Sequence, residues 1–185
     1  MKKKTKITLF AAAAILLAAG LAIVYFSSSL NHFGKKREIN DIGKYKEAFA
    51  QEGSNLPALP ADDRLGKYND VDFLFKESVG MIISMRWYRI DLQFDAAEYE
   101  TQKAYLNDAC DFIEQAGHKT NGYAPTFSYR GYSFHTETEI SFPKELSFVG
   151  FNDAQRKICL IRFEDADLDD ASDFPIFFEE HGFLD

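Results

Sequence analysis

Residues 81–94 read MIISMRWYRIDLQF and decide the fold. From position 88 onward, apolar and polar side chains take turns along this stretch. The apolar set is Tyr88, Ile90, Leu92 and Phe94, and the polar set between them is Arg89, Asp91 and Gln93. A period of two is typical of a β-strand with one face in the core. The stretch therefore predicts a strand.

A helix is predicted directly after this strand. Asp95 suits the cap position, and Glu98 follows three residues later, as in a capping box. The expected buried stripe has helical spacing and consists of Leu106, Ala109, Cys110 and Ile113. Gly117 supplies a stop signal.

The remaining elements are predicted from the same two patterns, the period of two for strands and the helical spacing of apolar residues for helices. Strands are predicted at 71–75, 126–135, 146–151 and 157–163, the last two joined as a hairpin by 152–156. Helices are predicted at 37–52 and after Ser172 or Asp173, with Pro175 in the first turn and Gly182 as the stop. We expect an α+β fold, with an antiparallel sheet of about five strands packed by two or three helices.

The amino-terminal segment predicts a membrane anchor. Ile7 to Phe26 is an uncharged apolar run of twenty residues, and such a helix spans about 30 Å, the thickness of the hydrocarbon core. Ser27 and Ser29 leave cleavage of a signal peptide as an alternative. The expected organisation is a basic cytoplasmic tail (1–6), a single transmembrane helix (7–26), a juxtamembrane helix and Pro-containing linker (27–63), and a globular domain outside the cytoplasm (64–185).

The charge balance excludes a nucleic-acid binder. The first thirty residues hold four of the 21 Lys and Arg and none of the 29 Asp and Glu, so residues 30–185 carry a formal charge of −12. Nucleic-acid binding needs a basic face that releases phosphate counterions. The two cysteines also exclude a disulfide scaffold and a Cys-based zinc finger.

The only tryptophan lies beside an arginine, a composition common in binding hot spots. If Tyr88 points into the core, Trp87 and Arg89 point outward and form a binding patch. A second packed layer, such as the juxtamembrane helix, would hide them equally well.

An aromatic stretch at 123–134 offers a second binding surface. A bulge at Gly131 would place Phe127, Tyr129, Tyr132 and Phe134 on one face, with Arg130 on the other. Such a row can anchor a protein, and with Tyr123 it can stack on sugar rings. The alternative is the core side of a strand under a helix.

Two acidic clusters are candidate metal sites. His135, Glu137 and Glu139 share a strand face and could hold a divalent ion for a hydrolase, or be the wet face of an edge strand. The second cluster, Asp165, Asp167 and Asp169, could bind Ca²⁺ weakly or be a solvated loop. No cofactor is otherwise expected.

Cys110 and Cys159 both suit buried positions. If the predicted helix packs on the predicted strand, the two thiols come close, and an oxidising compartment would allow a disulfide. We expect two free buried thiols, since both positions suit a small apolar side chain.

The sequence shows none of the common catalytic motifs. We expect a membrane-anchored binding domain with a protein partner at the membrane surface, in a regulatory, assembly or immunity-like role. A metal-dependent hydrolase using His135, Glu137 and Glu139 is one alternative, and a cell-wall carbohydrate-binding module is another.

Overall fold

The computed structural model describes residues 36–80, 84–114, 124–137, 145–165 and 173–184. The predicted membrane segment 7–26 lies outside these ranges. Within them, no helix has the length and apolar character needed to cross a bilayer.

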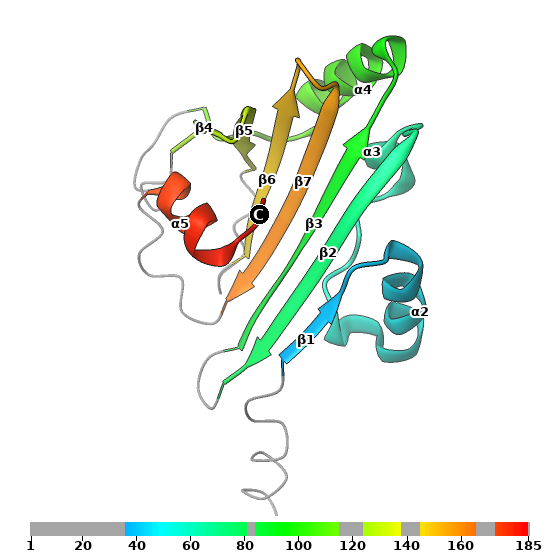
Figure 1. Ribbon diagram of the computed structural model, residues 1–185, viewed down its shortest axis with the longest axis vertical. Helices are drawn as coiled ribbons and strands as arrows, with labels where there is room; N and C mark the ends of the chain where they lie inside the picture. Colours follow the sequence, from blue (N-terminus) through cyan, green and yellow to red (C-terminus); the bar gives the residue numbers. More distant parts are fainter. Residues whose placement is uncertain (1–35, 81–83, 115–123, 138–144, 166–172, 185) are drawn as a thin grey trace, which may run out of the picture.

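One antiparallel sheet organises the described residues (Figure 1). Its seven strands lie in the order β1-β2-β3-β7-β6-β5-β4. Their bounds are β1 Lys36–Ile39, β2 Asp70–Val79, β3 Ser84–Gln93, β4 Thr126–Tyr129, β5 Tyr132–Thr136, β6 Glu145–Asn152 and β7 Lys157–Asp165. The strand predicted from residues 81–94 is β3, and it lies near the middle of the sheet between β2 and β7.

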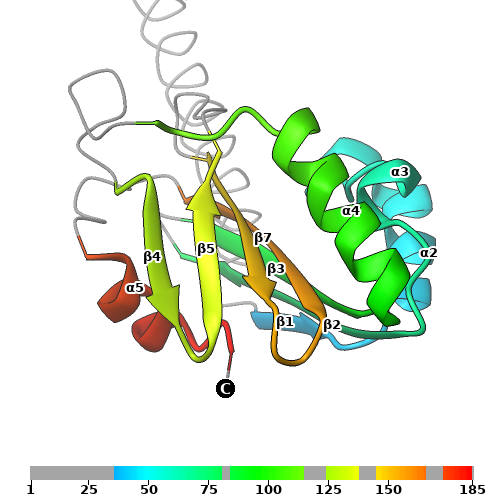
Figure 2. The same ribbon diagram turned by 90° about the horizontal axis from the view of Figure 1, so that it is seen from above.

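Helices cover both faces of the sheet (Figure 2). Their bounds are α2 Ile42–Glu52, α3 Asp62–Leu65, α4 Ala96–Ala109 and α5 Phe174–His181, with a 3-10 turn at Gly53–Asn55. The face that carries Tyr88, Ile90 and Leu92 lies under α2, α3 and α4 and is called the three-helix face. The opposite face, which carries Trp87, lies under α5 and is called the α5 face.

Local sequence signals start α4 and α5 where expected. The Asp95 carboxylate accepts the amide protons of Ala97 and Glu98, each at 2.9 Å, and begins α4. Asp173 caps α5 and Gly182 ends it in the left-handed conformation. However, α4 ends at Ala109, so the predicted helix is too long. Ile113, which we expected on its buried stripe, lies in the segment after the helix.

The α+β class and the antiparallel sheet are confirmed, but the strand number is wrong. The predicted helix 37–52 is in fact β1 followed by α2, which the Asp41 carboxylate caps. The predicted strand 126–135 is a hairpin, because Arg130 and Gly131 both have positive φ and turn the chain back. Phe127 lies opposite Phe134 and Tyr129 opposite Tyr132, so these aromatics share a face through a turn, without a bulge.

The two ends of the strands carry different features. We call the end at which the chain enters β1 the near end, and the opposite end the far end. At the near end, the chain enters β1 at Lys36, β2 ends at Val79 and β6 begins at Glu145. At the far end lie two hairpin turns, Arg130–Gly131 and Asp153–Arg156.

The carboxy-terminal residues 182–184, called the strap, close the α5 face. Phe183 is fully buried, and its ring meets the Trp87 ring edge-on at 4.7 Å. Phe163 and Phe178 complete the aromatic cluster around it. The strap thus supplies part of the second core layer.

Candidate binding site

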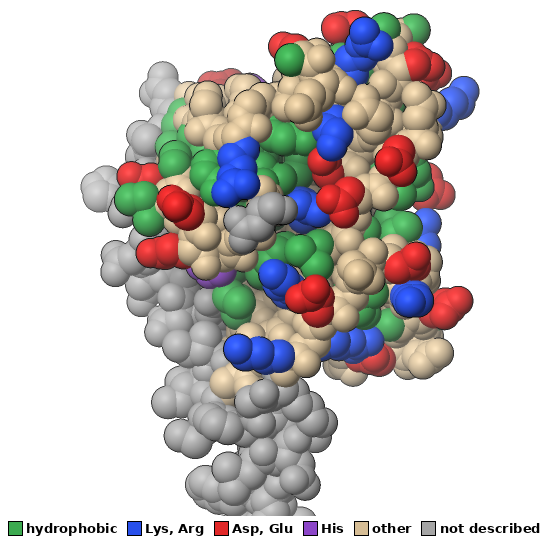
Figure 3. All heavy atoms as spheres, viewed as in Figure 1, with side chains coloured by type: hydrophobic (Ala, Val, Ile, Leu, Met, Phe, Trp, Pro, Cys, Tyr) green, Lys and Arg blue, Asp and Glu red, His purple; other side chains and the backbone are tan. Residues whose placement is uncertain are grey.

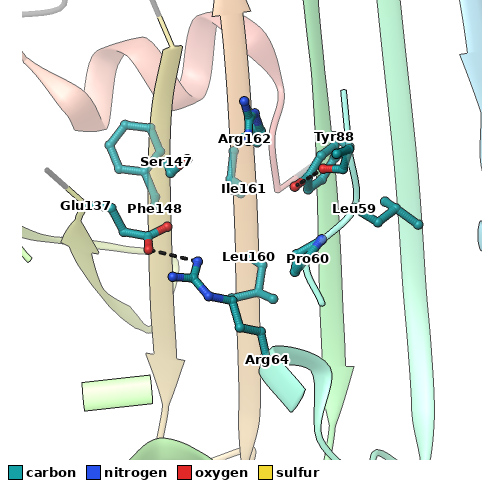
Figure 4. A pocket seen from close by; sticks show the side chains of 11 residues that line it. Leu59, Pro60, Arg64, Tyr88, Glu137, Ser147, Phe148, Leu160, Ile161 and Arg162 are labelled. Carbon is teal, nitrogen blue, oxygen red and sulfur yellow. Dashed lines mark hydrogen bonds and ion pairs between the residues drawn. The ribbon is translucent and has the colours of Figure 1, made fainter. Parts of the chain in front are cut away.

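A cleft of about 100 Å³ opens on the three-helix face towards the near end (Figure 4). Its floor is the sheet, and one wall is the segment Ala58–Pro60, which leads into α3. The polar side chains lining it belong to Arg64, Tyr88, Glu137, Ser147 and Arg162. Five separate parts of the sequence therefore meet at the cleft.

Strand register explains why polar groups gather here. Tyr88, Arg162 and Ser147 are cross-strand neighbours on β3, β7 and β6. One step nearer the chain entry, Arg86, Glu164 and Glu145 form the next row across the same strands. Farther along, the same face is apolar, with Ile90, Leu160 and Val149 in one row. The core face thus becomes charged only towards its near end.

Glu137 and Arg64 form an ion pair across the cleft. Arg64 Nη1 donates to Glu137 Oε1 at 3.0 Å, and the Glu137 side chain is only 12% exposed. Glu137 is held in place because its amide donates to the Ser147 carbonyl at 2.9 Å. Arg64 lies on the short helix α3. Its ion pair with Glu137 therefore connects the segment before β2 to the sheet.

Arg162 lies between two acids on the cleft floor. Its Nε donates to Glu164 at 3.2 Å, and its Nη2 bonds the Glu145 carboxylate. Glu164 also pairs with Arg86 Nε at 2.9 Å. These four side chains are 14–32% exposed, so solvent reaches them only partly.

Neighbouring neutral groups stay protonated. Burial is the main cause that raises the pKa of the Tyr88 hydroxyl, which donates to the Ala58 carbonyl at 3.1 Å. Burial, with a smaller effect of Glu137, raises the pKa of the Cys110 thiol to about 12. Neither group is a nucleophile at neutral pH. The cleft instead offers guanidinium and carboxylate groups side by side, an arrangement suited to recognition of polar side chains.

The predicted Trp87–Arg89 patch is not at the surface. Trp87 is fully buried and Arg89 is 7% exposed. Arg89 Nη1 donates to the Phe183 carbonyl at 3.2 Å, and Nη2 bonds Asp72. Sequence periodicity correctly placed these residues opposite Tyr88, but α5 and the strap supply a second layer over them, a role that we considered for the juxtamembrane helix.

The predicted aromatic surface is mostly core. Tyr132 is 6% exposed and its hydroxyl donates to Asp91 at 2.7 Å. Tyr129 is half-buried and packs on Phe178 with ring centroids 5.6 Å apart. Arg130 is exposed at the hairpin turn, and Tyr123 lies outside the described residues. The described aromatics here do not form an exposed row.

The two predicted metal clusters lie only partly within the described residues. His135 contacts the Phe112 and Phe151 rings, while Glu137 pairs with Arg64. Asp165 ends β7, whereas Glu139, Asp167 and Asp169 fall outside. Over the part of the chain that the structure describes, no three His, Cys, Asp or Glu side chains converge as metal ligands would.

Cys110 and Cys159 do not come together. Both thiols are free and buried, but Cys110 belongs to the core of the three-helix face and Cys159 to that of the α5 face. Their separation by the sheet removes the predicted proximity.

The cleft residues other than Glu137 were missed from the sequence. Arg162 gave one usable signal, because it shares a strand face with Ile158 and Leu160, where a charge is unexpected. Arg64 gave none, since it lies at the end of a loop-like stretch.

Comparisons of the chain with protein-family models, with curated proteins and with solved structures returned no match.

Proposed function

We propose that this chain is a membrane-tethered binding protein whose α+β domain captures another protein beside the bilayer through the charged cleft. The observation that carries the proposal is a charged row, Arg86, Glu164 and Glu145, beside the row that contains Arg162, on a sheet face that is otherwise apolar. Ion pairs that solvent partly reaches contribute little to stability. They do contribute specificity when a partner of complementary charge meets them.

The position of the cleft fits a partner beside the membrane. Nine residues lie between Phe26, the end of the apolar run, and Lys36, the start of β1, so the two are ten chain steps apart. A fully extended chain of that length reaches at most about 35 Å. With 7–26 in the bilayer, this tether would keep the start of β1, at the near end, within about 35 Å of the lipid headgroups.

The partner chemistry follows from the groups in the cleft. Arg64 and Arg162 offer forked donors to carboxylates, and Glu137 and Glu145 offer acceptors to basic groups. Arginine is enriched in energetic hot spots of protein interfaces. We therefore expect a protein segment that carries both acidic and basic side chains.

Site-specific photocrosslinking in cells tests the proposal with the full-length chain. A photoreactive amino acid at Ser147, on the cleft floor, should crosslink to one protein, whereas the same group at exposed Ser128 on β4 should not. Arg162→Ala should abolish the Ser147 product, because its guanidinium lies beside that position.

Two controls separate binding from folding. Lys46→Ala, an exposed substitution on α2, should leave the Ser147 crosslink intact. Arg162→Ala should keep the near-ultraviolet circular dichroism of the parent chain. Equal crosslinking from Ser147 and Ser128, or an unchanged Ser147 product in Arg162→Ala, would overturn the assignment of the cleft.

A further inference from the structure

A second hollow, of about 290 Å³, opens at the near end beside the edge strand β1. It is lined by residues 36–38 of β1, 76–78 of β2 and Met85 of β3, and we call it the β1 hollow. It shares no lining residue with the cleft, so the two are separate. Figure 3, which has the viewpoint of Figure 1, shows basic side chains at this end of the described surface, towards the bottom of the view.

Strand register puts two lysines on the same face of the β1 hollow. Lys36 lies opposite Ser78 on β2, and Lys76 is two residues before Ser78, so the lysines are diagonal neighbours. Lys76 also lies opposite Trp87, and its Nζ is 5.5 Å from the centre of that ring, which identifies the shared face as the α5 face. Diagonal neighbours on antiparallel strands are about 7–8 Å apart, so two flexible four-carbon stems can meet over one ligand.

The two lysines are not neutralised by ion pairs with other described residues. Arg37 and Glu77 belong to the opposite face of their strands, where Arg37 pairs with Glu52 at 2.9 Å. Glu38 is the one acid of the lining on the face of the lysines, and it forms no ion pair with the lysine opposite it on β2. Two lysines and one glutamate leave a net positive charge on this face, whereas residues 30–185 together carry −12.

The β1 hollow contains the described residue that is nearest in sequence to the apolar run. This residue, Lys36, is ten chain steps from Phe26, so a tether in the bilayer would keep it within about 35 Å of the headgroups. Anionic lipid surfaces attract lysine and arginine next to a membrane segment. They repel the acidic remainder of the domain, so a locally basic hollow would favour approach of the near end.

We propose that the β1 hollow binds the phosphate group of an anionic membrane lipid, with Lys36 and Lys76 donating to the phosphate oxygens. Each ammonium group has three donors and no acceptor, and the Ser78 hydroxyl adds one donor. Charge-assisted hydrogen bonds of this kind are shorter and stronger than neutral ones. The half-buried Met85 and the lysine stems supply apolar contacts for the glycerol part of the lipid. The inference rests on the membrane tether of the proposed function and not on its protein partner.

Titration of the full-length chain in neutral detergent micelles with dihexanoylphosphatidylglycerol tests the inference. Trp87 is the only tryptophan, and Lys76 Nζ lies over its ring, so transfer of this ammonium group to a phosphate should give a saturable change in Trp87 fluorescence. The melting temperature should rise over the same concentrations, because the lipid binds the folded chain. Dihexanoylphosphatidylcholine, whose headgroup has no net charge, should give neither effect.

Three single variants separate the charge of the β1 hollow from the charge of the whole chain. Lys36→Gln should weaken the binding of phosphatidylglycerol at least about tenfold, since a charge-assisted hydrogen bond is lost. Glu38→Gln should strengthen the binding, because it removes the acid from the same face. Lys67→Gln makes the same charge change as Lys36→Gln at an exposed position before β2, at the far end, and should bind normally. The near-ultraviolet circular dichroism of each variant should match that of the parent chain.

Four outcomes would overturn the inference. They are the lack of a saturable response to phosphatidylglycerol, binding by Lys36→Gln that is no weaker than that of Lys67→Gln, weaker binding by Glu38→Gln, and an equal response to inorganic phosphate, which would indicate a site for any anion. The titration needs no protein partner and the Ser147 crosslink needs no added lipid, so failure of the inference and failure of the proposed function are distinguishable.

Discussion

Gly150 shows how closely a single position can be specified. It lies opposite Phe134 on the neighbouring strand, and an added Cβ would come within 2.3 Å of the Phe134 ring. That ring is fully buried and packs against the rings of Tyr132 and Phe178. Glycine is therefore needed for its missing side chain, and the ring occupies the space that a Cβ would take.

Gly150→Ala should lower the free energy of unfolding by about 1–3 kcal/mol, the usual cost of overpacking a core. Urea denaturation measures the difference. Phe134→Leu in the same chain should recover part of the loss, because the smaller side chain frees the contested space. Additive effects of the two substitutions would show that the clash is not the cause.

His135 makes stability depend on pH. Desolvation, with a smaller effect of Lys103, lowers the pKa of its imidazole in the folded chain. The unfolded state then binds the proton more readily, so this contribution is present above about pH 6.5 and is lost as the pH falls through that value. The melting temperature should fall between about pH 7.5 and about pH 5.5.

His135→Gln should reduce this fall, while groups that titrate at lower pH affect both chains equally. An identical pH dependence in the two chains would exclude His135 as the cause.

At the scale of elements, the strap depends on one ring and two main-chain carbonyls. Phe183 fills the space over Trp87, while Arg89 and Arg130 bind the carbonyls of Phe183 and Leu184. Because these two arginines contact the backbone, the Phe183 ring is the part of the strap most dependent on side-chain identity.

Phe183→Ala should cost about 3–5 kcal/mol and uncover the only tryptophan. Trp87 emission should shift to longer wavelength before global unfolding, as measured by fluorescence during a urea titration. Ile176→Ala is the matched control, because that side chain on α5 is 54% exposed. A Trp87 spectrum that is unchanged in Phe183→Ala would show that the strap does not shield it.

Elements with strong local signals were predictable, and those defined by distant partners were not. Apolar and polar side chains alternate regularly over residues 88–94. The acids Asp95 and Asp173 directly precede α4 and α5, the helices that they cap. By contrast, β1 has four residues, and its strand conformation comes from pairing with β2 some forty positions away. Arg130–Gly131 lacks the asparagine that usually marks a two-residue hairpin turn.

At the scale of the whole molecule, the second layer was the missing information. The alternation of apolar and polar residues assigned side chains to the correct faces of the strands. It contains no information about which element covers each face. Trp87 and Cys159 were misjudged for this reason, since both belong to the core under α5. The cleft could not be predicted for the same reason, because Arg64 on α3 and Glu137, which follows β5, come together only in the folded chain.

The strand order also implies a route by which the chain folds. Strands β1 to β3 form one meander and β4 to β7 another, and within each meander every pairing is between consecutive strands. Only the β3–β7 ladder joins the two, linking residues such as Ile90 and Leu160 across seventy positions. Loop closure over that distance is the slow, entropically costly event. The edge of β3 that pairs with β7 therefore stays unpaired until β7 has been synthesised. During this interval its free backbone groups can pair with a wrong strand.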